Sequence, residues 1–167
     1  METGKVNNKS RSKLLVCLGG DFIDEEIELM QLLNEAYENG KIDLSIIIRF
    51  HPNPTLKAKY PKKVFLYKNF EYDNSENLLN SIISKRPRAI ISGPSSSFTY
   101  GLVTGVPVIF FAPNGLSIFE KIYCSELIED CSFSLESMGK LIKMIKNINK
   151  LPKRVSSLQE QFNKIDR

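Results

Sequence analysis

The sequence predicts a doubly wound α/β domain, with a mostly parallel sheet of about six strands and helices on both faces. Two observations lead to this fold class. Apolar runs of Val, Ile, Leu and Phe alternate along the chain with segments of helical periodicity. The runs are continuous rather than alternately polar and apolar, which is typical of parallel strands that are covered on both faces. The length of 167 residues suits one such domain.

The first half of the chain alternates strands with helices. The first strand ends in the pair Gly19-Gly20, and the next helix has an acidic first turn and stops at Gly40. Strands are expected at KLLVCLGG (13–20), LSIIIRF (44–50), KVFLY (63–67) and RAIIS (88–92), and helices at 24–40 and 74–86.

The second half continues the alternation. A helix is predicted to open within GPSSSFTYGLVTG (93–105), followed by a strand at PVIFF (107–111), a helix at 117–130 and a short strand at CSFSL (131–135). Residues 136–167 are expected to form C-terminal helices that pack on the domain. Residues 1–12 are polar and basic and are expected to be a disordered lead-in or linker, so the single domain spans 13–167.

Composition excludes several classes of protein. No apolar run approaches the roughly 18 residues of a membrane span, and the N-terminus has no signal-peptide pattern, so we expect a cytoplasmic protein. The cysteines at 17, 124 and 131 match neither a zinc site nor a disulfide framework, and no metal is expected.

Basic residues gather near the C-terminus. Residues 138–167 contain eight Lys or Arg against two acidic residues, within a net charge of +4. The favoured interpretation is a solvated helix face, and the alternative is peripheral contact with an anionic membrane, at its inner face. Nucleic acid is not an expected partner, because no binding motif is present.

Three loops are predicted to meet at one edge of the sheet. Parallel strands place their carboxyl ends together, and ligands bind in crevices along that edge. The loops begin at Gly19-Gly20, at His51-Pro52 and at Gly93. The glycine pair allows close approach of a ligand, a partner domain or the backbone, and a plain turn explains it equally well.

The serines after Gly93 form a candidate phosphate cradle. A helix N-terminus exposes unpaired N–H groups, and successive hydroxyls add donors without adding charge. The candidate contacts are Gly93, Ser95, Ser96, Ser97 and Thr99. The plainer alternative is that the serines only cap the helix.

The only histidine of the chain, His51, stands where a buried strand ends. An imidazole at this edge could bind a phosphate, or protonate it as it leaves, whereas a structural histidine would only bond a neighbouring carbonyl. Arg49 lies on the same strand face and could add charge or pair with an acidic side chain. Pro52 fixes the exit of the chain from the strand.

Together these motifs resemble the C-terminal, donor-binding half of GT-B glycosyltransferases, a Rossmann-like domain. The resemblance covers roughly residues 13–135 and rests on a strand ending in His-Pro, a Ser-Ser turn that opens a helix, and Gly-x-Pro-Val-Ile. Bacterial sialyltransferases, polysialyltransferases and related surface or capsular polysaccharide enzymes have such motifs, and teichoic-acid glycerophosphotransferases are similar.

The resemblance implies a function and roles for residues. The chain would bind a nucleotide-sugar donor linked to CMP, UDP or CDP, with no cofactor. His51 would bind the phosphate and stabilise the leaving group, and the serines would contact the phosphate. The loop around Tyr67 and Asn69 would lie near the base.

The sequence departs from this family pattern in two ways. Many such domains have Glu-Ala before the Gly-x-Pro-Val motif, where the glutamate binds ribose, but this chain has Tyr100 and Gly101. A GT-B enzyme also needs a second, acceptor-binding domain, for which this chain has no room. We therefore expect the chain alone to be inactive, and to need an N-terminal acceptor domain or a partner subunit.

Two other functions fit the same residues. A non-catalytic nucleotide-binding, regulatory or interaction module would use the same phosphate cradle. A serine hydrolase would use Ser95 in a motif like G-x-S-x-G, but the last glycine is missing and His51 precedes the serine. Among acidic residues, Glu120 is the best candidate near the ligand edge. The acidic residues of the first helix, Glu26 included, are explained by the helix dipole.

Overall fold

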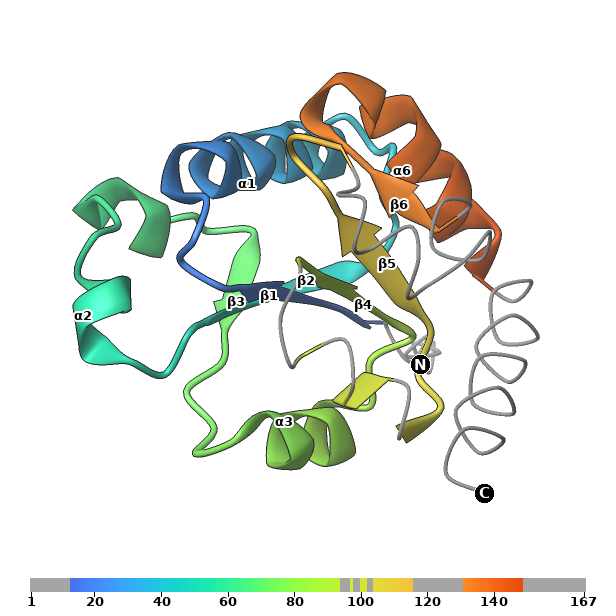
Figure 1. The fold of residues 1–167 in the computed structure, drawn as a ribbon. Helices are drawn as coiled ribbons and strands as arrows, with labels where there is room; N and C mark the ends of the chain where they lie inside the picture. Colours follow the sequence, from blue (N-terminus) through green and yellow to red (C-terminus); the bar gives the residue numbers. More distant parts are fainter. Residues whose placement is uncertain (1–12, 94–96, 98–99, 102–103, 116–130, 149–167) are drawn as a thin grey trace, which may run out of the picture.

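The computed structural model describes residues 13–93, 97, 100–101, 104–115 and 131–148 (Figure 1). Six strands form one sheet in the order β3-β2-β1-β4-β5-β6, and every neighbouring pair is parallel. This is the strand order of the Rossmann-like, doubly wound fold, so the predicted fold class is confirmed. The strands are β1 (Lys13–Leu18), β2 (Ser45–Phe50), β3 (Phe70–Tyr72), β4 (Ala89–Ser92), β5 (Val108–Phe111) and β6 (Ser132–Phe133).

Helices cover both faces of the sheet (Figure 1). On one face, α1 (Ile23–Glu38) and α6 (Met138–Lys146) pack over a core that includes Leu14 and Val16. On the other face, α3 (Leu78–Lys85) packs over a smaller core that includes Leu15. Alternate residues of β1 therefore serve opposite cores, which explains why the strand is apolar throughout.

A further helix connects β4 to β5, and its residues 97, 100, 101 and 104 are described. We call it the crossover helix. It lies on the same face as α3, because Gly101 faces Val108 and Ile90 of the smaller core. Ser97, the first described residue of this helix, follows β4 and so lies toward the carboxyl edge of the sheet.

The prediction of a strand at KVFLY (63–67) is wrong. Residues Lys62–Phe65 form a 3-10 helix, η1, and the third strand is β3, which begins later. Pro61 stands in extended backbone before η1, and the turn that follows buries Val64 completely. The apolar residues of this segment thus reach the core from a turn, without pairing in the sheet. The short helix α2 (Pro54–Lys57) was also not predicted.

Helix α6 supports the interpretation of its lysines as a solvated face. Leu141, Met144 and Ile145 are buried, while Lys143 and Lys146 are exposed on the other side of the helix. Within the described part of the chain, no helix is both long and apolar enough to cross a membrane. The predictions made for 1–12, 117–130 and 149–167 lie outside the described residues.

Gly101 sets how closely the crossover helix approaches β5. A Cβ atom at this position would lie 2.1 Å from Val108 Cγ2 and 3.4 Å from the Val106 carbonyl oxygen. We therefore predict that Gly101→Ala lowers the free energy of unfolding by about 1–3 kcal/mol, as overpacking of a core does. Urea unfolding followed by circular dichroism measures this change.

Gly139→Ala in α6 is the matched control, because a Cβ atom there meets nothing within 4 Å. Alanine should stabilise that helix by up to about 1 kcal/mol. Equal gains in stability for both variants would contradict the close approach at Gly101.

Candidate functional site

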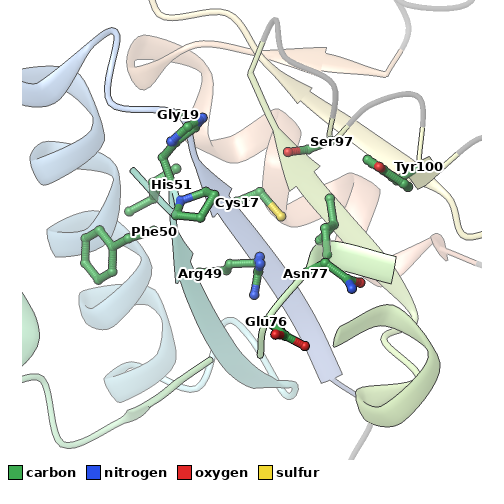
Figure 2. Close-up of a pocket in the computed structure, with 12 residues that line it drawn as sticks. Cys17, Gly19, Arg49, Phe50, His51, Glu76, Asn77, Ser97 and Tyr100 are labelled. Carbon is green, nitrogen blue, oxygen red and sulfur yellow. The ribbon is translucent and has the colours of Figure 1, made fainter. Parts of the chain in front are cut away.

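A pocket of about 260 Å³ lies at the carboxyl edge of the sheet (Figure 2). It is lined by the ends of β1 and β2, the segment between β3 and α3, and the crossover helix. The lining residues are Cys17, Leu18, Gly19, Arg49, Phe50, His51, Pro52, Glu76, Asn77, Leu78, Ser97 and Tyr100.

The structure brings several predicted residues together here. Gly19, Arg49, His51, Pro52 and Ser97 come from three separate segments and line this one pocket. In Figure 2 the Cys17 side chain is drawn to the right of the His51 ring and below Ser97. The arrangement expected of parallel strands, with the loops after β1, β2 and β4 at one edge, is therefore observed.

Other predicted residues lie elsewhere or outside the described part. Gly93 follows β4 and packs near the Phe111 carbonyl, and neither it nor Gly20 lines the pocket. The remaining candidates, Ser95, Ser96, Thr99 and Glu120, lie outside the described residues.

Arg49 is held in a buried ion pair. Its guanidinium nitrogen Nη1 donates to Asp73 Oδ2 at 2.7 Å and to the Ser75 carbonyl oxygen at 2.9 Å. The two charged side chains are 8% and 1% exposed. Arg49 thus connects the end of β2 to the segment after β3, and Asp73 offsets the charge that it brings to the pocket.

Asp73 is held as a carboxylate by its partners. Burial raises the pKa of Asp73, but hydrogen bonds from Ser75 and from Arg49 outweigh it and lower the pKa to about 2. The Ser75 backbone N–H and hydroxyl both donate to Asp73 Oδ1, at 3.1 and 2.5 Å.

His51 has one ring nitrogen committed to its own loop. The Asn53 backbone N–H donates to His51 Nδ1 at 3.1 Å, and Asn53 in turn caps α2 by accepting a hydrogen bond from the Thr55 N–H at 2.9 Å. The ring is partly exposed and lines the pocket. Nε2 is therefore the nitrogen left for a ligand.

Cys17 forms part of the pocket wall next to Arg49 in the sheet register. Burial raises the pKa of its thiol to about 12, and a hydrogen bond with Ser97 and the nearby Arg49 charge only partly offset this effect. The thiol is consequently protonated at neutral pH and is no nucleophile. Its contact with Ser97 ties the crossover helix to the end of β1.

Glu26 occupies the backbone donors of the glycine pair. Its Oε1 accepts from the Gly19 N–H at 2.9 Å, its Oε2 accepts from the Gly20 N–H at 3.2 Å, and the Tyr60 hydroxyl donates to Oε2. Burial raises the pKa of this carboxyl, and the hydrogen bonds oppose the rise. The loop after β1 binds pyrophosphate in many dinucleotide-binding folds. Here the N–H groups of Gly19 and Gly20 in this loop already donate to Glu26.

This finding corrects the interpretation of Glu26 as a residue that only offsets the helix dipole. Glu26 is 5% exposed and lies on the buried stripe of α1, with Leu29, Met30 and Leu33. Its helical spacing with those apolar residues was the signal in the sequence. An acidic residue on an apolar stripe needs buried hydrogen-bond donors, and the glycine pair provides them.

Tyr67 and Asn69 do not line the pocket. They precede β3, so they lie toward the opposite edge of the sheet from the segment that follows it. The Asn69 side chain donates to Asn34 and to Glu38 of α1, and the Tyr67 backbone N–H donates to the Tyr72 hydroxyl. Because β3 was assigned too early in the sequence, the wrong loop was expected at the ligand edge.

The segment after β3 contributes lining residues that the sequence did not single out. Glu76 and Asn77 line the main pocket, and Asn77 also caps α3 by accepting a hydrogen bond from the Asn80 N–H at 2.8 Å. With β3 placed at FEY, the polar residues that follow it would have been the signal for this side of the pocket.

A second pocket of about 200 Å³ adjoins the first. The two share Arg49, Phe50, His51 and Pro52, so the His51 loop separates them. Lys57, which lies over the Phe50 ring, adds a positive charge to the second pocket. No group of three or more potential metal-ligating side chains occurs among the residues that the structure describes.

Comparison with known proteins supports the fold. No protein-family model matches the sequence, and no curated protein matches it. Among solved structures, the glycosyltransferase SnogD from Streptomyces nogalater matches with a TM-score of 0.56 and 16% sequence identity. The match covers 90% of this chain but 40% of SnogD. In fold, the chain thus resembles one half of a GT-B glycosyltransferase.

We predict that Asp73→Asn lowers the free energy of unfolding by about 3 kcal/mol near pH 7, because it leaves Arg49 buried without its counter-ion. The pH dependence follows from the lowered pKa of Asp73. Its contribution is present above the ordinary value of 3.8 and is lost as pH falls through about 2, so the two proteins should converge in stability there.

Glu71→Gln is the matched control for this prediction. Glu71 pairs with Lys85 and Lys13, but its side chain is 42% exposed, so the loss should be below about 1 kcal/mol. Urea unfolding at several pH values measures both variants. A loss at Asp73 no larger than at Glu71 would contradict a structural role for the buried pair.

Proposed function

We propose that this chain is the donor-binding half of a GT-B-type glycosyltransferase, and that it holds the phosphate of a nucleotide-sugar between His51 and the crossover helix. One observation supports this most. Arg49, His51 and Ser97 come from distant parts of the sequence and line a single pocket at the ligand edge of a Rossmann-like sheet.

The chemistry of the pocket suits a phosphate group. Of its charged lining residues among those described, Arg49 and Glu76 have opposite signs, so binding would depend mainly on hydrogen-bond donors. Among the described residues, the donors that line the pocket include the His51 ring and Ser97. Glu26 already accepts hydrogen bonds from the Gly19 and Gly20 N–H groups. An anion would therefore bind on the side of the pocket that His51 and Ser97 line.

These donors would also assist sugar transfer. When the glycosidic bond to the phosphate breaks, negative charge grows on the departing oxygen, and donors already in place stabilise it without reorganisation. The acceptor and a catalytic base would come from an N-terminal half or a partner subunit. The pocket volume of about 260 Å³ agrees with one wall of a shared site, since complete ligand sites span about 300–1,000 Å³.

The finer features of the proposal rest on motifs alone. The His-Pro and Ser-Ser motifs suggest a CMP-, UDP- or CDP-linked donor and a role in surface or capsular polysaccharide synthesis, at the cytoplasmic side of the membrane. Tyr100 lines the pocket and stands at the sequence position where many GT-B donor domains have the ribose-binding glutamate, so ribose recognition would differ here.

A serine hydrolase is not favoured by the geometry of His51. In such an enzyme the histidine accepts the serine proton on one nitrogen and donates from the other to a carboxylate. Here Nδ1 accepts a backbone hydrogen bond, so it has no proton to donate.

Titration of the chain with CMP, CDP, UDP and GDP, followed by thermal unfolding, tests the proposal. A bound nucleotide must stabilise the native state, by about 2.7 kcal/mol at one hundred times its Kd, which raises Tm by about 5–10 °C. No shift with any of the four nucleotides would contradict the proposal. Nucleotide binding without sugar transfer, in any longer form or with a partner half, would favour a non-catalytic module.

His51→Ala should weaken nucleotide affinity about tenfold or more, because a hydrogen bond to a charged group contributes about 1.5–3 kcal/mol. Ser97→Ala should weaken it as well. Ser84→Ala is the control, since Ser84 lies in α3 and is not among the lining residues. Isothermal titration measures the affinities, and equal affinities for the Ser97 and Ser84 variants would remove Ser97 from the site.

A further inference from the structure

The protonation state of the His51 ring follows from its hydrogen bond to the backbone. The Asn53 N–H lies 3.1 Å from His51 Nδ1, and an amide nitrogen can only donate. Nδ1 must therefore offer a lone pair. A neutral imidazole has one N–H, so its proton resides on Nε2.

The backbone donor is fixed before any ligand binds. Asn53 is the N-cap of α2, and its own side chain holds the Thr55 N–H at 2.9 Å. Pro52 and Pro54 flank it, and each restricts the backbone of the loop. The ring thus meets a preorganised amide that selects one tautomer.

Nε2 is the ring nitrogen that remains for the two adjoining pockets, both of which His51 lines. We propose that His51 acts as a neutral Nε2–H donor to a phosphoryl oxygen, and that the Asn53 backbone amide is the positioning group that keeps it in this form. This inference rests on the proposed function for the identity of the ligand.

In this form His51 donates a hydrogen bond and does not act as an acid. During sugar transfer the acceptor hydroxyl oxygen bonds to the anomeric carbon, and its proton goes to the base of the acceptor-binding half. The bond from the anomeric carbon to the phosphate oxygen breaks, and its electron pair stays on that oxygen. The His51 proton remains on Nε2 and is shared in a hydrogen bond. The leaving phosphate departs as an anion, without a proton transferred from an imidazolium.

Two-dimensional 1H–15N NMR of the ring tests the tautomer directly in the free protein. The chain has one histidine, so its signals need no assignment by mutation. At about pH 8.5 we expect a single tautomer with Nδ1 unprotonated and Nε2 protonated, as the hydrogen bond from Asn53 requires. An Nδ1–H tautomer, or the averaged signal of the urea-unfolded chain, would overturn the proposal.

Nucleotide affinity of His51→Gln tests the role of the neutral donor. A glutamine amide can donate a hydrogen bond from about the position of Nε2, but it cannot become a cation or transfer a proton. We expect it to retain CMP or UDP affinity within about threefold of the wild type, while His51→Ala loses about tenfold or more. Glutamine as weak as alanine would overturn the neutral-donor role.

Two variants of Asn53 test the positioning group. Asn53→Ala keeps the backbone N–H and loses only the cap, whereas Asn53→Pro removes the N–H and fits the native φ of −66°. We expect the tautomer to persist in the alanine variant and to become mixed in the proline variant. An unchanged tautomer in a folded proline variant would overturn the role of the amide.

These results separate the inference from the proposed function. The tautomer is measured without nucleotide, so a single Nε2–H form in a protein that binds none of the four nucleotides would refute the proposed ligand and leave the tautomer intact. A protein that binds nucleotide but has an Nδ1–H ring would refute the tautomer and leave the proposed ligand intact.

Discussion

The pocket depends on the parallel pairing of β1 with β2 on one side and with β4 on the other. In the sheet register Cys17 stands opposite Arg49 of β2 and Ser92 of β4. Because the three strands run in the same direction, the residues that follow them emerge at one edge. Reversal of either neighbouring strand would send its loop to the far edge and separate His51 from the crossover helix. The apolar residues of β1, buried on both faces, stabilise this arrangement.

Two buried acidic residues occupy hydrogen-bond donors at that edge. Glu26 takes the N–H donors of Gly19 and Gly20, and Asp73 takes one guanidinium nitrogen of Arg49. Both carboxylates consume donors that a phosphate would otherwise use. The His51 ring, which lines the pocket, uses Nδ1 for the Asn53 N–H and leaves Nε2 for the ligand that we propose.

The fold class and the position of His51 at the carboxyl edge of the sheet could be predicted from the sequence. Both follow from the pattern of apolar residues within single strands and helices. The apolar run IIIRF predicts a buried strand, and parallel strands require that His51 lies at the ligand edge. The error at η1 arose because Val64 is buried by a turn as completely as a strand would bury it. As a result, the loop around Tyr67 was expected beside the pocket in place of the segment after β3.

Contacts between elements could not be predicted in this way. The partner of Arg49 follows a strand of three residues, whose pattern is too short to locate. The role of Glu26 depends on how α1 approaches the glycine pair, which is a property of packing. The hydrogen bond from Asn53 to His51 depends on backbone angles that the motif His-Pro does not determine alone.

We propose that a phosphate binds at His51, and the ring signals of that single histidine report on it most directly. NMR titration of the labelled chain should compare CMP and UDP with cytidine and uridine, which have the base and ribose but no phosphate. We expect a saturable change in the ring signals with the nucleotides and little change with the nucleosides. Nucleotides that stabilise the protein while the ring signals stay unchanged would contradict it.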